Sequence, residues 1–560
     1  MVLKPTVSDI LIDILADAGV RHVFGIPGDA INAFVEAIRR QDRVRFIQVR
    51  HEETGAMAAS AQAKLTGELA ACVGTAGPGA IHLLNGLYDA KLDHAPVLAI
   101  TGQVETQYVG TDYHQEVDLF TLFKDVAAFN EVVMNVNQMP QLAEQAIRTA
   151  IAERSVSHLS LPLDIAGGRV GGSRHRQPPY RNDALISPCE DDLDRAARVL
   201  NGASRVAILA GIGAAGARSE LLALAERLRA PIIKTLRAKD LLPDEHPYVV
   251  GGLGLLGTRP AVDVIEECDA LLLVGTDFPY HDFYPKDVPA VQIDVEPSRL
   301  GKRYPIEVGL AGHAHLALTG LTKRVHEKDR EDFLASAQKR MASWFAEMDE
   351  IERSDDEPMH PQRLARAVGD LADDDAIFAC DTGAVTVWGA RNLRIRDGQK
   401  FVLSSSLASM AFAMPAAIGA QLAYPGRQVI ALAGDGGLGM LLGDFVTAVK
   451  YELPITVVVF NNHKLGLIQM EQEVQGYPEF QTELHNPDFA AVARASGGEG
   501  IRVTDPADLD GALRTAFSTS RPYIVDVLVN PEERTMPPRI EMWQALGYGV
   551  AKVKEFVSRE

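Results

Sequence analysis

The sequence predicts an α/β protein with three doubly wound parallel-sheet domains. Short, almost continuously apolar strands alternate with helical patterns along the whole chain, which is typical of parallel sheets that helices cover on both faces. Two polar, turn-rich segments, 167–188 and 325–361, divide these strands into three groups. The 560-residue chain is 47% hydrophobic and 23% charged, which is the balance of a globular protein with large cores.

The domain limits follow from the dividing segments. We expect domains over 1–180, 188–325 and 358–530, followed by a C-terminal tail over 531–560. The first domain should begin with an amphipathic helix over 1–19, which ends at a glycine. The predicted strands cover residues 22–26, 45–49, 69–75 and 95–102, then 204–211, 230–236, 270–276 and 290–295, and then 376–380, 401–405, 428–434, 455–462 and 523–529.

Charge and cysteine content exclude some classes of protein. The net charge of −20 is spread along the chain, which disfavours nucleic acid as a partner because phosphate binding needs a basic face. The four cysteines lie far apart without a CxxC pair, so we expect buried, reduced thiols in a cytoplasmic protein. The N-terminal segment does not resemble a signal peptide, and no apolar run is long enough to span a bilayer.

Three glycine-rich turns follow predicted strands, at 74–80, 210–216 and 433–437. In open parallel sheets the carboxyl ends of the strands carry the ligand sites, and helices that begin there offer free N–H groups to phosphate. The turn at 210–216 matches GxGxxG. The next strand is followed by Arg237 and has no acid at its end, which disfavours NAD bound in the usual way. This turn either holds another nucleotide or only packs a helix against the sheet.

The turn at 433–437 contains an aspartate, Asp435. One helix and one strand later the chain reads Asn461-Asn462, and adjacent parallel strands would bring these side chains to the same sheet edge. A carboxylate and an amide oxygen suit Mg²⁺, which shares its coordination shell with phosphates. Each residue alone would be a turn cap, but the spaced set predicts a diphosphate that Mg²⁺ joins to Asp435.

The GDG…NN spacing resembles the signature of enzymes that depend on thiamine diphosphate (ThDP). Such enzymes need a glutamate whose carboxyl group protonates N1′ of the cofactor. The segment VRHEETGAMAA, which follows a predicted strand, places Glu52 at the start of a helix. As a mere first-turn acid Glu52 would contribute under ~1 kcal/mol, whereas acid–base assistance of the proposed kind is worth ~10²–10⁴ in rate.

Nearly the whole chain resembles the pyruvate oxidase family, which includes the quinone-linked pyruvate dehydrogenases. The likeness implies a PYR domain, a central FAD domain and a PP domain, with ThDP, Mg²⁺ and FAD as cofactors. It also implies a homotetramer, a dimer of dimers, whose active sites combine Glu52 of one subunit with the Asp435 turn of another. The motifs that carry it are FGIPGDAIN, RHEETGAMAA, AKLTGELAACVGTAGPGAIHLLNGLYDA, HAPVLAITGQ, FPYHDFYP, QIDVEPSRLGKR, AMPAAIGAQ, GDGGLGMLLGDF and TELHNPDFA.

The resemblance also implies roles for individual residues. The catalytic residues would be Glu52, His114, Gln115 and Glu471. The metal ligands would be Asp435, Asn462 and the backbone carbonyl of Lys464. The ThDP-binding residues would be Pro27, Gly28, Gly77, Asn85, Ala408, Ser409, Met410, Gly434, Asp435, Gly436, Gly437, Asn462 and Leu467. The FAD-binding residues would be Gly211, Gly213, Arg237, Leu253, Gly254, Leu255, Leu256, Thr276, Asp277, Phe278, Pro279, Tyr280 and Asp294.

Two of these assignments have a simple alternative. Met410 resembles the large residue that bends ThDP and so brings its reacting groups together, but it would otherwise be a core residue. The segment Phe278-Pro279-Tyr280 would otherwise be loop structure, although an unusual one without a ligand to cover it.

The resemblance implies oxidative decarboxylation of pyruvate, or a close 2-oxo acid, to acetyl phosphate or acetate plus CO₂, with the electrons passed to O₂ or a quinone. One alternative is a carboligase similar to acetolactate synthase, in which FAD is structural. Those enzymes typically carry PGG where this chain has Pro27-Gly28-Asp29, and the FPYHDFYP segment favours the oxidase branch. Another alternative is a non-catalytic relative that only binds nucleotides, which an intact Glu52 and Asp435 disfavour.

Three positions depart from the family pattern near the expected substrate. His114 stands where Phe is usual, Leu467 stands where the oxidases have Phe, and Thr382 stands where Val is common. His114 could act as an acid or base or would be a hydrogen-bonded wall residue. These changes leave the identity of the 2-oxo acid open.

The tail has an amphipathic pattern, with Leu546, Val550, Val553 and Val557 on one predicted helical face. Quinone-linked relatives use a longer extension to contact membrane. This tail is short and only modestly basic, so the pattern favours docking on the protein's own subunit over contact with lipid.

Overall fold

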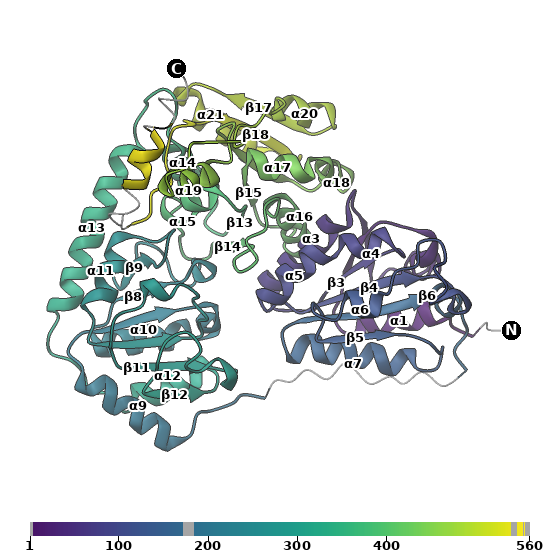
Figure 1. The fold of residues 1–560 in the computed structure, drawn as a ribbon, viewed down its shortest axis with the longest axis horizontal. Coiled ribbons are helices and arrows are strands. Elements are labelled where there is room, and N and C mark those ends of the chain that lie inside the picture. The colour runs from purple at the N-terminus through teal and green to yellow at the C-terminus, as the bar shows by residue number, and fades with distance from the viewer. Residues whose placement is uncertain (1–3, 172–183, 539–545, 553, 555–560) are drawn as a thin grey trace.

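The computed structural model describes residues 4–171, 184–538, 546–552 and 554. It contains three parallel sheets of six strands each. The first and third domains meet at a central contact, and the long helix α13 (Asp332–Glu352) lies along the outer edge of the second and third domains, away from the first (Figure 1). Alternate strand residues face different cores: Phe24 belongs to one apolar cluster and its neighbour Val23 to another. Helices therefore cover both faces of the sheets, which confirms the predicted fold class.

The first sheet has the strand order β2-β1-β3-β4-β6-β5. Its strands are β1 (His22–Gly25), β2 (Arg45–Gln48), β3 (Ala70–Gly74), β4 (Val97–Gln103), β5 (Phe129–Val132) and β6 (Val156–Pro162). Its helices are α1 (Val7–Asp17), α2 (Asn32–Arg39), α3 (Glu52–Thr66), α4 (Pro78–His82), α5 (Leu84–Leu92), α6 (Leu119–Leu122), α7 (Met139–Ala152) and α8 (Leu163–Ala166).

The second sheet has the order β12-β11-β10-β7-β8-β9. Its strands are β7 (Val206–Ala210), β8 (Ile232–Lys234), β9 (Val249–Gly252), β10 (Ala270–Val274), β11 (Ala290–Asp294) and β12 (Val308–Ala311). Its helices are α9 (Glu190–Gly202), α10 (Arg218–Leu228), α11 (Arg259–Glu267) and α12 (Ala314–Thr322). Helix α13 then runs along the outside of the molecule to the third domain (Figure 1).

The third sheet has the order β14-β13-β15-β16-β18-β17. Its strands are β13 (Ile377–Cys380), β14 (Lys400–Leu403), β15 (Val429–Gly434), β16 (Ile455–Asn461), β17 (Glu499–Val503) and β18 (Tyr523–Leu528). Its helices are α14 (Pro361–Leu371), α15 (Ala384–Arg391), α16 (Ala413–Ala423), α17 (Asp435–Leu441), α18 (Phe445–Lys450), α19 (Gly466–Val474), α20 (Phe489–Ala495) and α21 (Leu509–Ser518).

The sequence reading missed five strands, for two physical reasons. Four of them, β5, β9, β12 and β17, are edge strands, which pair on one side only and do not need a continuous apolar run. The fifth, β6, lies inside the first sheet, but its sequence carries Ser157, His158 and Ser160, all fully buried. Thr101 and Asn130 hydrogen-bond the imidazole of His158 at 2.8 and 2.7 Å, so this buried ring is satisfied in the core, whereas the hydroxyls of Ser157 and Ser160 have no hydrogen-bond partner among the described residues.

The first and third domains pack directly on each other through α3 and α16. A Cβ atom built on Gly419 would lie 2.3 Å from the carbonyl oxygen of Ala58, so the two helix backbones touch. Beside this contact, the buried ammonium of Lys64 binds Asp89 and Asp93 at 2.7 Å each and the carbonyl of Leu403 at 3.0 Å. Helix α3 is thereby fixed to the third domain of its own chain.

The tail contacts its own chain by a different face from the predicted one. Residues 546–552 are helical, and a Cβ built on Gly547 would lie 2.0 Å from the carbonyl oxygen of Val474. Ala551 is fully buried, whereas Leu546 and Val550 are 64% and 48% exposed. Leu546 thus faces largely outward, which corrects the prediction for that residue, whereas Cγ1 of Val550 lies 3.7 Å from the position of a Cβ on Gly476 and is in contact with its own chain. The other two members of the stripe, Val553 and Val557, lie outside the described residues.

Two further expectations from the sequence can be compared with the structure. The four cysteines are free, but Cys189 is exposed rather than buried. None of the helices within the described residues is long and apolar enough to cross a membrane.

Candidate functional site

The carboxyl edge of the third sheet brings the predicted metal ligands to neighbouring strands. Strands β15 and β16 are parallel neighbours, and Gly434 pairs with Phe460. The register therefore places Asp435, the first residue of α17, opposite Asn461 and next to Asn462. The prediction that the two strands are adjacent is correct.

Asp435 is held in a buried, hydrogen-bonded position. Its side chain is almost fully buried, and this burial raises its pKa to about 6. Oδ1 accepts the backbone N–H of Gly436 at 3.0 Å, and Oδ2 accepts the side-chain N–H of Asn486 at 2.7 Å. A dication at this carboxylate would favour its charged form, which burial alone disfavours.

Asn486 is a site residue that the sequence analysis did not assign. Its Nδ2 bonds both Asp435 and the Oδ1 of Asn461, the latter at 3.1 Å. Asn461 is fully buried and donates to Asp526 at 2.8 Å. A chain of polar groups, buried except for the half-buried Asn486, thus runs from Asp526 to Asp435 and orients the latter. The sequence signal for Asn486 was the segment TELHNPDFA, which contains it and contributed to the family resemblance, although no role was assigned to its residues.

The glycine turn leaves no room for side chains. A Cβ atom on Gly437 would lie 2.1 Å from Oδ2 of Asp381, and one on Gly436 would lie 3.0 Å from Leu465. Asp381 accepts the backbone N–H groups of Thr382 at 2.9 Å and Phe412 at 3.0 Å, and burial raises its pKa to about 7. This carboxyl group, also missed in the sequence, ties the turn to the loop that precedes α16.

That loop carries the predicted residues 408–410 in a strained conformation. Ala408 and Ala411 have φ of 56° and 69°, a left-handed region that costs non-glycine residues energy and that clusters at functional sites. Cε of Met410 lies 3.4 Å from the position of a Cβ on Gly436. The structure therefore brings the predicted wedge residue to the predicted diphosphate turn.

Asn462 and Lys464 lie at the end of β16. The backbone N–H of Lys464 donates to Oδ1 of Asn462 at 3.1 Å. The ammonium of Lys464 points away to Glu479 and Glu532, at 3.2 and 3.1 Å. The side chain of Lys464 is thus engaged elsewhere, and only its backbone carbonyl is suited to a metal.

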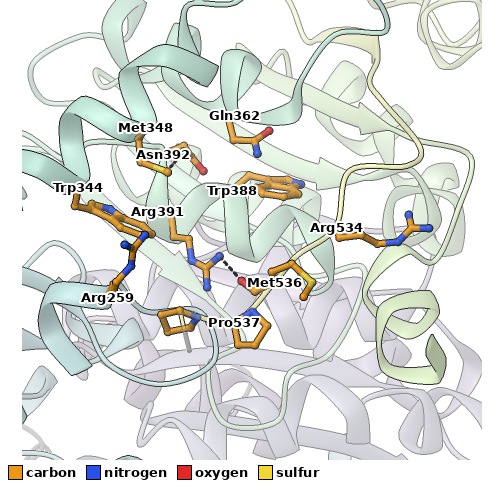
Figure 2. Close-up of a pocket in the computed structure, with 11 residues that line it drawn as sticks. Arg259, Trp344, Met348, Gln362, Trp388, Arg391, Asn392, Arg534, Met536 and Pro537 are labelled. Carbon is orange, nitrogen blue, oxygen red and sulfur yellow. Dashed lines mark hydrogen bonds between the residues drawn. The ribbon is translucent and has the colours of Figure 1, made fainter. Parts of the chain in front are cut away.

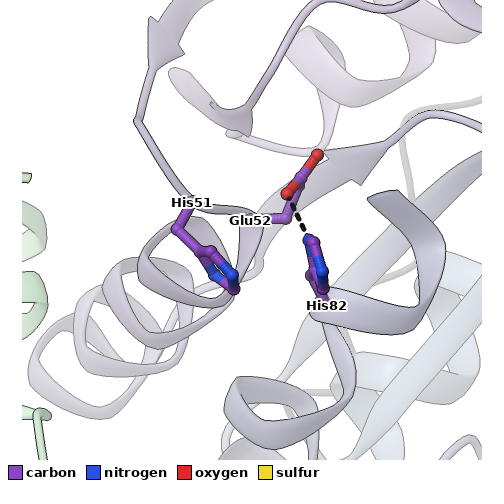
Figure 3. Close-up of side chains that lie close together, drawn as sticks. All are labelled: His51, Glu52 and His82. Carbon is purple, nitrogen blue, oxygen red and sulfur yellow. Dashed lines mark hydrogen bonds and ion pairs between the residues drawn. The ribbon is translucent and has the colours of Figure 1, made fainter. Parts of the chain in front are cut away.

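Glu52 lies in the first domain, at the start of α3. It is 6% exposed, and its Oε2 lies 2.9 Å from Nδ1 of His82, at the end of α4 (Figure 3). Its Oε1 is 3.0 Å from the position of a Cβ on Gly79, so the carboxyl group lies directly against the backbone of α4. A side chain at residue 79 would displace it.

Other predicted ThDP residues lie around Glu52. Asn85 donates to Oε1 of Glu53 at 2.6 Å and to Oγ of Ser409 at 2.8 Å, which joins the first domain to the strained loop of the third. Gly77 has a φ of 64°, and a Cβ there would lie 2.9 Å from the carbonyl oxygen of Gln115.

The loop after β1 carries Pro27 and Gly28. A Cβ on Gly28 would lie 2.4 Å from that of Thr75. The backbones of the loops that follow β1 and β3 therefore approach closely.

The predicted substrate-side residues are largely exposed in the single chain. His114, Gln115 and Glu471 are exposed, and Leu467 and Thr382 are half-buried. Gln115 has a φ of 63°, a second sign of backbone strain in this region.

The predicted flavin segments lie at the carboxyl edge of the second sheet. A Cβ on Gly211 would lie 2.3 Å from the carbonyl oxygen of Gly275, and one on Gly213 would lie 2.7 Å from the Cα of Gly275. A 3-10 helix (Ile212–Ala217) follows this turn before α10 begins, so the turn does not lead straight into an α-helix. The glycines allow the ends of β7 and β10 to approach each other.

Thr276 to Tyr280 and Asp294 complete this edge. Phe278 is buried with Tyr280 and Tyr284 packed edge-on against its ring. The expectation that this loop needs a ligand to cover it is therefore wrong for Phe278. Asp277 is paired with Arg299 and Arg303. Asp294 is 8% exposed, and burial raises its pKa.

The loop 253–257 is fixed from the third domain by Arg391, at the end of α15. Its guanidinium donates to the carbonyl groups of Gly257, Leu255 and Met536 at 2.9, 2.8 and 2.7 Å. Figure 2 shows Arg391 in the wall of a cavity of about 420 Å³ between the central domain, α13 and the third domain. Two tryptophans, Trp344 and Trp388, line the same cavity. The conformation of this predicted flavin loop thus depends on the third domain.

Comparison with known proteins identifies the three domains. Residues 5–122 match the N-terminal TPP binding domain of the thiamine pyrophosphate enzymes, residues 193–321 their central domain and residues 381–527 their C-terminal TPP binding domain. The chain belongs to the thiamine pyrophosphate enzyme family. Thiamine pyrophosphate is ThDP under its other name, and the three matches together identify a ThDP-binding enzyme.

The relatives of this ThDP enzyme include both predicted branches. The Bacillus subtilis protein YdaP is 43% identical over 99% of this chain and 97% of its own. Pyruvate oxidase of Lactiplantibacillus plantarum is 32% identical over 98% and 92% of the two chains. The acetolactate synthase large subunit of Parasynechococcus marenigrum is also 32% identical, over 94% and 88%. Overall identity therefore does not separate the oxidase from the synthase.

Proposed function

We propose that this enzyme decarboxylates pyruvate, or a close 2-oxo acid, oxidatively to acetyl phosphate or acetate plus CO₂, using ThDP, Mg²⁺ and FAD, and passes the electrons to O₂ or a quinone. The observation that carries the proposal is the carboxyl edge of the third sheet, where a buried carboxylate, a glycine turn and a strained loop meet. The choice of the oxidase branch rests on the FPYHDFYP segment and on Asp29.

The residues of this edge fit Mg²⁺ and a diphosphate. The donors are oxygens: the carboxylate of Asp435, the side-chain amide of Asn462 and the backbone carbonyl of Lys464, as Mg²⁺ prefers. A Cβ on Gly437 would collide with Asp381, and one on Gly436 would crowd Leu465, so the glycines let the turn present backbone to the diphosphate. When bound, ThDP supplies a carbon nucleophile and accepts the electrons that decarboxylation releases.

Glu52 supplies a proton in this proposal. Its buried carboxyl group would hold the proton on N1′ of the cofactor, which is general acid–base assistance. Oε2 has His82 as its neighbour at 2.9 Å, so cofactor binding replaces or shares that contact. Met410, next to Gly436, would support the bent cofactor.

We propose that two copies of the chain complete each site. In the single chain the catalytic candidates His114, Gln115 and Glu471 are exposed. Apolar side chains in the same regions are exposed too: Ile81, Tyr113, Ile468, Tyr477 and Phe480. A second copy would cover both sets, which supports a homo-oligomer with Glu52 and Asp435 contributed by different subunits.

We also propose that FAD binds at the carboxyl edge of the second sheet. The two close-packed glycines Gly211 and Gly213, the buried acid Asp294 and the loop that Arg391 holds support this site. The wide spacing of the cysteines supports a cytoplasmic location. The domain limits 1–180, 188–325 and 358–530 are likewise proposals, and each of these ranges encloses one sheet.

Anaerobic flavin reduction tests the function. Purified enzyme with ThDP, Mg²⁺ and FAD is mixed with pyruvate without air. Bleaching of the flavin with release of CO₂ is the expected result, and Glu52→Gln should abolish it. Addition of phosphate, O₂ or a quinone analogue then identifies the acceptors.

The identity to acetolactate synthase favours a second candidate function, carboligation. It predicts acetolactate from pyruvate, with CO₂ release, unchanged flavin absorbance and no O₂ uptake. A protein that only binds nucleotides would release no CO₂ at all. Either result would contradict the oxidase proposal.

A further inference from the structure

Two histidines flank Glu52 at the start of α3. His51 is the N-cap residue of α3, Glu52 is its first residue and His82 is the last residue of α4. The two imidazole rings are stacked, with centroids 4.3 Å apart. Each residue offers a ligand atom, and these atoms all lie within 4.8 Å of one another (Figure 3). The start of α3 and the end of α4 thus bring together a group that no spacing in the sequence indicates.

The donor set suits a transition-metal dication. Two imidazoles and one carboxylate are the ligands of open, three-residue Zn²⁺ sites, and the same donors bind Co²⁺ and Cu²⁺. Two ligands on a tetrahedral Zn²⁺ lie about 3.3 Å apart, given bonds of about 2.0 Å. Nδ1 of His82 and Oε2 of Glu52 are already 2.9 Å apart. An ion between these two atoms would replace the proton that they now share, with only a small shift.

His51 needs a larger adjustment. Its Nδ1 accepts the backbone N–H of Glu53 at 3.2 Å, so metal binding through either ring nitrogen costs that capping bond, because Nδ1 would bind the metal itself or would carry the proton moved from Nε2. The side chain of His51 is 39% exposed, so its solvent side is open. The cost is thus confined to one helix-capping hydrogen bond.

The surroundings favour a cation that enters from solvent. Oε2 of Glu53 lies 3.9 Å from His51, and the carboxylate of Asp444 accepts the backbone N–H groups of Arg50 and His51 at 2.7 and 3.1 Å. These carboxylates offset the positive end of α3. The imidazole of His82 is 42% exposed, while the side chain of Glu52 is 8% exposed. The imidazoles therefore form the entrance and the carboxylate forms the floor.

We propose that His51, Glu52 and His82 bind a transition-metal dication, such as Zn²⁺, in the cofactor-free protein, and that this ion competes with ThDP for Glu52. The first half stands on the geometry alone, and the second half rests on the proposed function. A subunit that holds Zn²⁺ here cannot offer Glu52 to the cofactor, so the metal inhibits loading of ThDP rather than turnover of the loaded enzyme.

Direct metal binding tests the first half. The full-length chain is stripped of metal and cofactor and carries Asp435→Ala, which removes the other predicted cation site. Titration with Co²⁺ should give the intense visible absorption of low-coordinate cobalt, and calorimetry should give one Zn²⁺ per chain. His82→Asn and His51→Asn should each weaken Zn²⁺ by more than about 10-fold, the least that loss of even an outer-sphere partner costs.

The variants are chosen to keep the fold. Asn is itself a favoured N-cap residue, so His51→Asn preserves the start of α3. His326→Asn, at an exposed histidine of the central domain, is the matched control and should bind Zn²⁺ like the parent. Unchanged Zn²⁺ affinity in the double variant of His51 and His82, or an equal loss in His326→Asn, would overturn the site.

Competition tests the second half, in the wild-type chain with excess Mg²⁺. Zn²⁺ at ten times its own Kd should raise the apparent Kd of ThDP about 11-fold by mass action. In the double variant of His51 and His82 the same Zn²⁺ should leave the Kd of ThDP unchanged. An unaffected Kd in the wild type, or an equal rise in the double variant, would refute competition at Glu52.

The outcomes separate this proposal from the proposed function. If Glu52→Gln still turned pyruvate over but lost the cobalt spectrum, the metal site would stand and the catalytic role of Glu52 would fall. If turnover required Glu52 but no cobalt spectrum formed, the metal site alone would fall.

Discussion

The two buried acids of the candidate site are held in different ways. Asp435 is fixed within its own domain by Asn486 and the backbone of Gly436, and a chain of buried groups extends behind it to Asp526. Among the residues that the structure describes, Glu52 has one side-chain partner, the half-exposed His82. The third domain thus presents a pre-organised metal ligand, whereas the first domain presents an acid whose partner can be exchanged for a cofactor, a proton or an ion.

The largest effect should come from the exchangeable acid. Glu52→Gln removes the proton donor while keeping the shape of the side chain, so CO₂ release from pyruvate should fall by about 10²–10⁴-fold. Binding of ThDP should change much less, because the diphosphate edge is intact. Glu68→Gln, just beyond the other end of α3, is the control. Full turnover in Glu52→Gln would show that Glu52 does not act as the proton donor that distinguishes it from Asp435.

The next largest effect should be on stability, through Asp381, the buried acid that lies against the glycine turn of the third domain. Burial raises its pKa to about 7 in the folded protein, from an ordinary value of 3.8. Folding therefore favours the protonated form, and the cofactor-free protein loses stability as pH rises from about 4 to about 7. The difference of about 3 pKa units corresponds to about 4 kcal/mol at most.

Asp381→Asn should remove that loss, since Asn keeps an oxygen for the N–H groups of Thr382 and Phe412. The difference in Tm between the variant and the wild type should therefore be more favourable to the variant at pH 8 than at pH 4.5. Calorimetry of the cofactor-free protein at both pH values measures this. An equal change in Tm between pH 4.5 and pH 8 in the two proteins would show that ionisation of Asp381 does not lower the stability of the folded protein.

A smaller effect should come from Asn486. Asn486→Leu removes the donor that orients Asp435 and leaves Oδ1 of Asn461 without this partner. Loss of such an outer-sphere partner typically costs about 10–100-fold in metal affinity. Electron paramagnetic resonance of Mn²⁺ in the presence of ThDP measures that affinity, and Asn530→Leu, further along the chain, is the control. Equal affinities would mean that the network does not orient Asp435.

The smallest effect should come from the tail. Leu546 and Val550 are exposed, so Leu546→Ser should change the free energy of unfolding by no more than about 0.5 kcal/mol. Ala551→Asp, on the buried face, should destabilise the contact with α19 measurably. Proteolysis of the tail compares the two. A large effect of Leu546→Ser would show that the outward face is covered in the assembly.

The sequence allowed the fold class to be predicted because the inner strands of a parallel sheet are apolar on both faces. Inner strands such as β15 and β16 are recognisable from their apolar sequence, whereas the edge strand β17 is not. Strand β6 shows a second limit of prediction from sequence. Its polar residue His158 favours a loop in the sequence, and only the fold shows that Thr101 and Asn130 hydrogen-bond it in the core.

The site residues divide in the same way. Asp435, Asn462 and Glu52 lie in motifs whose spacing is local, so the sequence could indicate them. Asn486 contacts Asp435, and Asp381 lies against Gly437 of the same turn, from segments distant in the chain, and no local pattern joins them. His51 and His82 were within quoted motifs, but only the fold shows that they converge on Glu52.

The contact between Ala58 and Gly419 has a consequence for how the molecule moves. Where two helix backbones meet with no side chain between them, neither can slide or rotate without a steric collision. The first and third domains of one chain should therefore travel as a single rigid block. Opening and closing motions during a catalytic cycle must then occur elsewhere, between subunits or at the central domain. Even the modest replacement Gly419→Ala would force this joint apart.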